Sequence, residues 1–277
     1  MNEAGSDRGV DAPAACANCG APLSGPFCAQ CGQEVKPLDP PVRRFAAEFA
    51  QELFDVDGRV PRSLRRLLFS PGFLTREHVE GRRIPWLSPL KLYLLASVAM
   101  FSVSAIAGGL GELKLVTSED VRAVNEELRK SGYASLWELQ RAIEAARLEW
   151  VPRVMFVLVP LLAGLAGLVE RRSRRHFPAH LVFALHVHAA GFAARAVAEG
   201  AALVVAPAWR EAFGRAAGIY IVGYVFLAFR TAYGAPRWRA AIDTALVAVV
   251  YVIVLVSATA VIIGLTMFGS QWLTGRF

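Results

Sequence analysis

Residues that commonly carry out chemistry are scarce in this chain, and those present are unevenly placed. Of its 277 residues only four are cysteine, all before residue 32, and only five are histidine. No apolar run precedes residue 87, so we expect no cleavable signal peptide and an amino-terminal region that stays in the cytosol. The sequence also lacks a Ser-His-Asp set, a His-Glu-x-x-His motif, a phosphate-binding loop and a dinucleotide fingerprint. It therefore gives no support to an enzymatic activity.

The four cysteines form two pairs. Cys16 and Cys19 make one Cys-x2-Cys unit, Cys28 and Cys31 make the other, and eight residues separate the pairs. This spacing is typical of a zinc ion held tetrahedrally by four thiolates. Because the protein supplies all four ligands, we expect a structural zinc rather than a catalytic one. Two disulfides or four free thiols are the alternative, and a reducing cytosol favours zinc over disulfides.

A glycine follows each pair, at Gly20 and Gly32. The chain must reverse sharply beneath the metal, and glycine accepts the positive φ angles that such a turn needs. We therefore predict a small zinc ribbon over residues 16–35, preceded by a disordered tail over residues 1–15. So small a unit cannot fold by burial alone, and the metal is expected to supply folding free energy on the order of 10 kcal/mol or more.

Most of the remaining chain is apolar. Hydrophobic residues make up 55% of the sequence and the mean hydropathy is +0.40, which is typical of a membrane protein. Runs of about 20 apolar residues indicate transmembrane helices. We predict five such helices, with four or six as alternatives, at residues 90–111, 151–169, 178–207, 216–229 and 241–268. The predicted fold class is an all-α integral membrane helical bundle, over residues 89–277, with the zinc ribbon at its amino terminus.

Clusters of arginine set the expected orientation. They lie between the second and third predicted helices and between the fourth and fifth. Because positive residues stay on the cytosolic side, we expect an inner (plasma) membrane protein with a cytoplasmic amino terminus and an extracytoplasmic carboxyl terminus. Apolar residues at helical spacing over about 117–150 predict an extracytoplasmic helical hairpin.

A basic segment, residues 36–88, joins the ribbon to the bundle. Arg62, Arg65 and Arg66 lie among leucines, in the pattern of an amphipathic helix on the anionic lipids of the inner leaflet. A zinc ribbon and a net charge of +7 are also found in nucleic-acid-binding proteins. Here the excess charge lies along the membrane-proximal segments, so we favour the lipid bilayer as partner over nucleic acid.

The third predicted span is unusually polar. At 100° per residue, His180, His188, Arg195 and Glu199 lie within an arc of about 100°, whereas His186 points nearly the opposite way. An unpaired charge in a bilayer costs at least a few kcal/mol, about 3 for an arginine at the helix centre. This face is therefore expected to turn toward other helices or a wet crevice.

Three interpretations of this polar face remain. The histidines could bond to tyrosines of neighbouring spans, such as Tyr220, Tyr224 or Tyr251, and hold the bundle together. They could instead form a site for a proton, an ion or a small ligand, as in a small ion- or proton-coupled transporter, although no internal repeat is visible. A metal site is the third interpretation, but His180 and His188 lie two turns apart and would need ligands from another helix.

Several short blocks, taken in order, resemble one known family. They are the two Cys-x2-Cys-Gly units and the segments at 57–59, 64–68, 70–72, 80–83, 89–93, 180–188 and 224–234. Together they resemble the bacterial membrane family catalogued as domain of unknown function 3667. The resemblance implies a multi-pass membrane protein with a cytosolic zinc ribbon, and it brings no activity or substrate. We expect an interaction, scaffold or regulatory protein whose ribbon docks a cytosolic protein partner.

Overall fold

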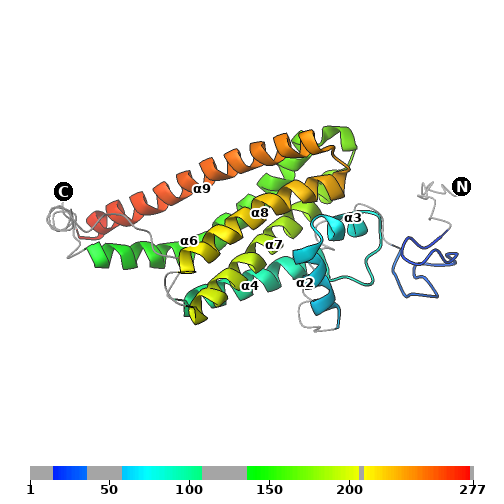
Figure 1. The fold of residues 1–277 in the computed structure, drawn as a ribbon, viewed down its shortest axis with the longest axis horizontal. Coiled ribbons are helices and arrows are strands. Elements are labelled where there is room, and N and C mark those ends of the chain that lie inside the picture. Colours follow the sequence, from blue (N-terminus) through cyan, green and yellow to red (C-terminus); the bar gives the residue numbers. More distant parts are fainter. Residues whose placement is uncertain (1–14, 36–57, 108–135, 206–208, 275–277) are drawn as a thin grey trace, which may run out of the picture.

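The computed structural model describes residues 15–35, 58–107, 136–205 and 209–274, and these residues form a helical bundle with a small cysteine-bearing unit at one end (Figure 1). The helices are α2 (Arg59–Phe69), α3 (Phe73–Val79), α4 (Pro89–Ile106), α6 (Leu136–Val169), η1 (Arg171–Ser173), α7 (Phe177–Val204), α8 (Arg210–Tyr233) and α9 (Arg237–Thr274). Within the described ranges, strand pairing is limited to two isolated bridges in the cysteine unit. The all-α prediction is confirmed for this part of the chain.

Five helices of the described part are long and apolar enough to cross a membrane, which agrees with the predicted number. They cover Pro89–Ile106, Glu149–Val169, Phe177–Val204, Glu211–Tyr233 and Arg237–Leu265. The fourth is longer than the predicted run at 216–229, which stopped at the nearest arginines. An arginine interrupts a run of apolar residues, but it does not have to end the helix. Its long side chain can reach the polar edge of a bilayer while its backbone stays helical.

Helix α6 extends beyond its membrane-spanning part. It runs without a break from Leu136 to Val169, so the second arm of the hairpin predicted at 117–150 continues directly into the second span. The other arm lies outside the described residues, and the hairpin stays a prediction. The tail predicted over 1–15, apart from Ala15, also lies outside them, as do residues 36–57 of the juxtamembrane segment.

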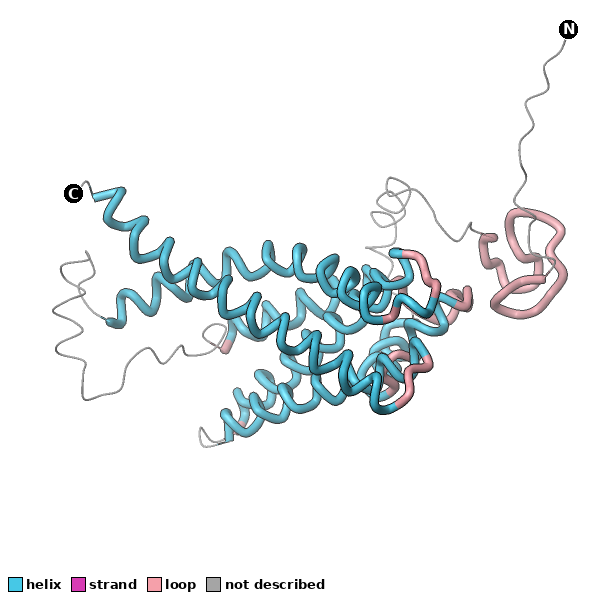
Figure 2. Tube along the Cα trace, turned by 90° about the horizontal axis from the view of Figure 1, so that it is seen from above, coloured by secondary structure: helices cyan, strands magenta, loops and turns pink. Residues whose placement is uncertain are grey.

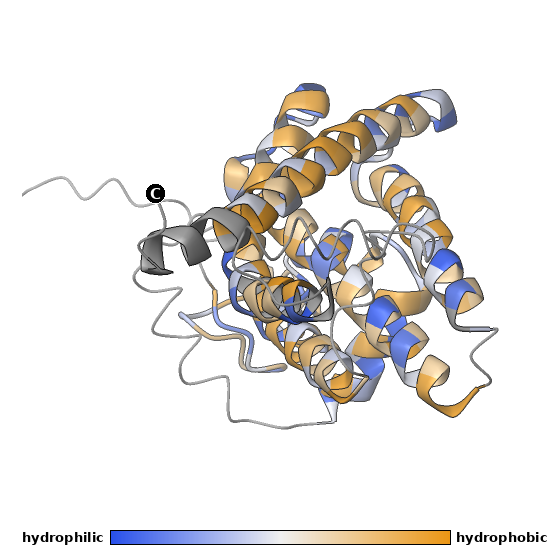
Figure 3. Ribbon diagram, turned by 90° about the vertical axis from the view of Figure 1, so that its left-hand side faces the viewer, coloured by the Kyte–Doolittle hydropathy of each residue, from blue (hydrophilic) through white to orange (hydrophobic). Residues whose placement is uncertain are grey.

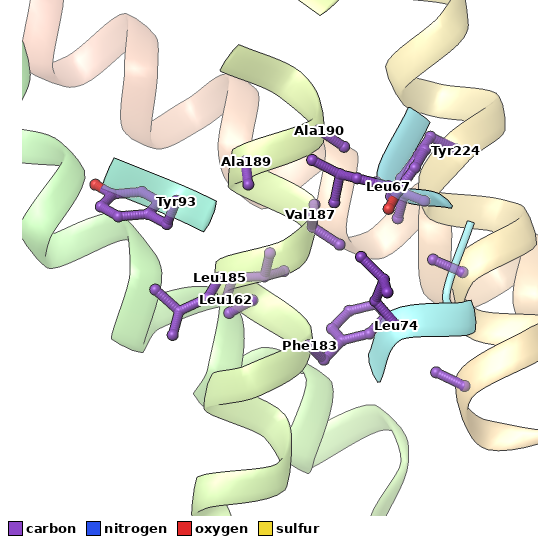
Figure 4. Close-up of a cluster of buried hydrophobic side chains, with 14 of the residues drawn as sticks. Leu67, Leu74, Tyr93, Leu162, Phe183, Leu185, Val187, Ala189, Ala190 and Tyr224 are labelled. Carbon is purple, nitrogen blue, oxygen red and sulfur yellow. The ribbon is translucent and has the colours of Figure 1, made fainter. Parts of the chain in front are cut away.

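Helix α7 lies at the centre of the bundle, in contact with α2, α3, α4, α6 and α8 (Figures 1 and 2). Within the protein, 56% of its span is buried, against 11% for α9. Alanines at 184, 189, 190 and 193 are buried and let the neighbouring helices approach closely. Figure 4 shows α7 side chains among Leu67 of α2, Leu74 of α3, Tyr93 of α4, Leu162 of α6 and Tyr224 of α8.

The outer faces of the peripheral helices are apolar. In α9, Val249, Val252, Ile253 and Val256 are exposed, and Figure 3 shows apolar residues along most of this helix. So large an exposed apolar surface is rare on soluble monomers and is expected where lipid covers the protein.

Helices α2 and α3 lie against the bundle near its cysteine-bearing end. Arg62, Arg65 and Arg66 of α2 are exposed, whereas Leu67 is only 1% exposed and belongs to the protein core. The Tyr220 hydroxyl of α8 donates a 2.7 Å hydrogen bond to the Leu68 carbonyl. The apolar face of α2 therefore packs at least partly on protein, and its contact with the inner leaflet stays a prediction.

Candidate functional site

The four cysteine sulfurs converge on one point. All four Sγ atoms lie within 4.8 Å of one another. The Cys16–Cys31 and Cys19–Cys28 sulfurs are 3.7 and 3.5 Å apart, far longer than a disulfide bond of about 2.0 Å. The cysteines are therefore free thiols, placed to hold a metal ion.

Two turns of the same design position these thiols. In the first, the Cys16 amide donates to the Ala21 carbonyl and the Gly20 amide to the Cys16 carbonyl, both at 2.8 Å. The second repeats this pattern between Cys28 and Gln33 and between Gly32 and Cys28, at 2.9 Å. Gly20 and Gly32 have φ angles of 76° and 71°, which confirms the conformation predicted for them.

The geometry fits a tetrahedral metal. A tetrahedral ion with bonds of about 2.3 Å to sulfur places neighbouring sulfurs about 3.8 Å apart, close to the two distances observed. Backbone hydrogen bonds from Cys31 and Gln30 lower the pKa of the Cys28 thiol, whereas the pKa of the neighbouring Cys19 thiol is raised, as expected when two close sulfurs share a proton that a bound metal would displace. All four ligand positions are filled by protein, so the site is suited to a structural ion.

The cysteine unit, residues 15–35, is attached to the bundle by Gln33. The Gln33 side-chain amide donates a 2.8 Å hydrogen bond to the Gly81 carbonyl, and its oxygen accepts one of 3.3 Å from the Arg83 amide. Gly81 has a φ angle of 86°, and a Cβ built there would lie 2.9 Å from the Cβ of Ala17. The loop at 80–83, between α3 and α4, thus provides a backbone surface that the cysteine unit approaches closely.

This docking loop, residues 80–83, is linked to the centre of the bundle. Arg82 forms an ion pair with Glu77 of α3, and this pairing holds the pKa of Glu77 below its ordinary value. Two residues earlier, the Thr75 hydroxyl lies 3.0 Å from Nδ1 of His186 in α7, and both side chains are buried. A continuous set of contacts therefore joins the cysteine unit, α3 and α7.

The other histidines of α7 also have partners. His180 Nδ1 lies 2.8 Å from the Tyr233 hydroxyl, and the two rings stack. His188 Nδ1 is 2.8 Å from the Ala184 carbonyl, and its Nε2 is 3.2 Å from the Tyr251 hydroxyl. Tyr251, one of the three tyrosines considered from the sequence, is thus a partner, whereas Tyr233 was not among them. All three histidines are buried.

The charged pair predicted on α7 forms as expected from its spacing. Arg195 and Glu199 make an ion pair one turn apart, and Glu199 also accepts a hydrogen bond from Ser104 of α4. The predicted polar face is therefore divided among three neighbouring helices: His180 turns to α8, His188 to α9 and Glu199 to α4. The structure does not gather the four side chains around one point.

A second polar cluster was missed from the sequence. The buried Glu170, which follows α6, accepts a 2.9 Å hydrogen bond from Arg239 of α9. Burial raises the pKa of Glu170 above its ordinary value, and the negative charge of the neighbouring Asp243 acts in the same direction. Asp243 could have been found, because it is the one acidic residue in the predicted run 241–268, and acids inside membrane helices are rare.

A comparison with known protein families found a match to the segment that carries the docking loop. Residues 57–101 match the family described as protein of unknown function, DUF3667. Over this segment, the match supports the family resemblance predicted from the sequence. The DUF3667 segment includes α2, α3, the docking loop and most of α4, so it contains the surface that Gln33 contacts. No curated protein and no solved structure matches the chain.

Proposed function

We propose that this protein is a membrane-anchored interaction or regulatory protein of bacteria. Its cysteine unit is a zinc ribbon that lies in the cytosol and docks a cytosolic protein partner, while the helical bundle holds it in the inner membrane. The exposed arginines of α2 contact the anionic inner leaflet.

The observation that carries this proposal is the attachment of the cysteine unit by Gln33. Two hydrogen bonds and the close approach of Ala17 to Gly81 hold the unit against the docking loop. A unit that only tethered the chain to a partner would need no such contact. Through α3 and the Thr75–His186 contact, the ribbon is connected to the central helix, and a regulatory module needs such a connection.

The ribbon also offers a contact for a partner. Phe27, next to the metal ligand Cys28, has 57% of its surface exposed. Large aromatic side chains are the commonest anchors of protein interfaces, because they bury much area at little entropic cost. A metal ion whose four ligands all come from the protein has no open position for catalysis. It can still support partner binding, because it holds a side chain such as Phe27 in place.

The test is to compare the partners of the full-length protein with those of a Phe27→Ala variant. Proteins are cross-linked in intact cells, purified through the membrane domain and quantified. We expect a defined set of cytosolic partners to fall at least about tenfold in the variant, the loss expected when an aromatic anchor worth about 2 kcal/mol is removed. Zinc content should stay unchanged.

Gln30→Ala is the matched control. Gln30 is also exposed on the ribbon, and removing its side chain leaves its backbone amide in place. This variant should keep the full set of partners. The docking function is wrong if Phe27→Ala retains the same partners, or if a chain without residues 15–35 does.

The alternative function, a small ion- or proton-coupled transporter that uses the polar face of α7, has weaker support. His180, His188 and Glu199 each bond to a different neighbouring helix, an arrangement that favours a role in holding the bundle together. Separate substitutions of His188 and Glu199 distinguish the two functions: loss of thermal stability supports the structural role, and loss of transport in a stable protein supports the transporter.

A further inference from the structure

A cavity of about 310 Å³ lies at the end of the bundle from which the cysteine unit also extends, and its lining includes neither a residue of that unit nor a histidine of α7. It lies where α6 ends and α9 begins, with η1 beside it. Its lining combines apolar and charged side chains: Val169, Arg171, Arg172, Trp238, Arg239, Ile242 and Asp243.

The cavity is cationic. Three arginines line it, and one of them, Arg239, is paired through its hydrogen bond to Glu170. Arg171 and Arg172 are exposed, and neither forms an ion pair with a residue that the structure describes. Both can therefore bind an anion without first breaking an existing contact.

Asp243 is the acidic side chain in the lining of the cavity, and the carboxyl group of Glu170 lies behind it as the partner of Arg239. Asp243 is 6% exposed, and Oδ2 of Asp243 and Oε1 of Glu170 are buried without a hydrogen-bond partner in the described part of the chain. Even with both carboxyl groups ionised, their two negative charges are fewer than the three positive charges of the arginines that line the cavity.

The remaining lining indicates an amphipathic ligand. Trp238 is 65% exposed and Ile242 is 58% exposed, and both lie in the first turns of a membrane-spanning helix. Tryptophan is enriched where membrane helices meet the headgroup layer. An anionic group among the arginines would therefore have apolar surface next to it, facing the lipid tails.

We propose that this cavity binds the phosphate group of an anionic phospholipid, with Arg171 and Arg172 donating to the phosphate oxygens and Trp238 and Ile242 contacting the glycerol and the start of the acyl chains. Arginine forks suit phosphate oxygens, and basic pockets between membrane helices commonly hold such headgroups. Glu170 holds the Arg239 side chain in the lining of the cavity through its hydrogen bond.

Native mass spectrometry of the full-length protein in detergent tests this assignment. Phosphatidylglycerol and phosphatidylcholine, which share a phosphate but differ in net charge, are added separately and the bound fraction is measured. We expect phosphatidylglycerol to bind preferentially, and the double variant R171Q/R172Q to bind it about tenfold more weakly, a loss equivalent to about 1.4 kcal/mol. Trp238→Ala tests the apolar side independently and should also weaken binding.

Arg174→Gln is the matched control, because Arg174 is exposed in the same connection but does not line the cavity. It should bind phosphatidylglycerol as the wild type does. An equal loss in Arg174→Gln, or equal binding of phosphatidylcholine, would show that surface charge alone attracts the lipid, and would overturn the site. Displacement of the lipid by millimolar inorganic phosphate would assign the cavity to a soluble phosphate and overturn the lipid assignment.

Discussion

Replacing Gly72 with alanine tests how α2 and α3 are held on the bundle. Gly72 has a φ angle of 76°, and a Cβ there would lie 2.7 Å from the Ala228 carbonyl oxygen and 3.0 Å from Cβ of Thr231. The left-handed conformation costs an alanine about 1–2 kcal/mol, and overpacking against the rigid backbone of α8 adds about 1–3 kcal/mol. We therefore expect Gly72→Ala to lower the free energy of unfolding by about 2–5 kcal/mol, measured by thermal and denaturant unfolding in detergent.

Gly58→Ala is the control for this experiment. Gly58 precedes α2 with a φ angle of −62°, and a Cβ there would meet no atom within 4 Å. Alanine at such a position changes stability by less than about 1 kcal/mol, in the stabilising direction, because it restricts the unfolded chain. If the two variants unfold alike, the turn at Gly72 is not pressed against α8 and the packing described for α2 and α3 is wrong.

Three further predictions concern the contacts between the cysteine unit and α7. Gln33→Ala should speed hydrogen exchange at the Arg83 amide, which loses its acceptor, and should leave the metal content unchanged; unaltered exchange would contradict the docking contact. Glu77→Gln should cost about 0.5–1 kcal/mol at pH 7, measured by thermal unfolding. Because Arg82 lowers the pKa of Glu77 in the folded protein, this difference should disappear as the pH falls through that lowered pKa, and a constant difference would refute the pairing. Thr75→Val should cost about 1–3 kcal/mol by leaving Nδ1 of His186 unpaired, whereas Thr259→Val on the exposed face of α9 should change little.

The cysteine unit was predictable because its geometry is local. Four ligands of one ion fix the paths of two short turns, so the spacing of the cysteines and the glycines at 20 and 32 determine most of the conformation. The membrane-spanning helices were predictable for a similar reason, since each meets its length and hydropathy requirement within its own sequence. The ends of these helices were not predictable, because a helix can continue past the charged residue at which its apolar run stops.

The partners of buried polar groups could not be predicted, because they depend on how each helix is rotated against its neighbours. The sequence placed His186 away from the polar face of α7, and on that side it meets Thr75 of α3 rather than lipid. His180 pairs with Tyr233, a residue at the end of α8, where the predicted run had already stopped. Glu170 and Asp243 are 73 positions apart, and only the packing of α6 against α9 brings them together.

The attachment of the cysteine unit to the docking loop could not be predicted from the sequence either. Gln33 directly follows the second Cys-x2-Cys-Gly unit, and the loop at 80–83 is another block of the family resemblance, but nothing in either segment indicates that they touch. The contact uses a side-chain amide against backbone groups, which leaves no charge pattern or periodicity to detect.

Zinc K-edge X-ray absorption of the purified full-length protein tests the central claim most directly. A zinc ribbon requires one zinc per chain with four sulfur neighbours at about 2.3 Å, and loss of the metal in the Cys28→Ser, Cys31→Ser double variant. A first shell containing nitrogen or oxygen, a sulfur number below four, or a metal-free protein with its cysteines in disulfides would contradict the account.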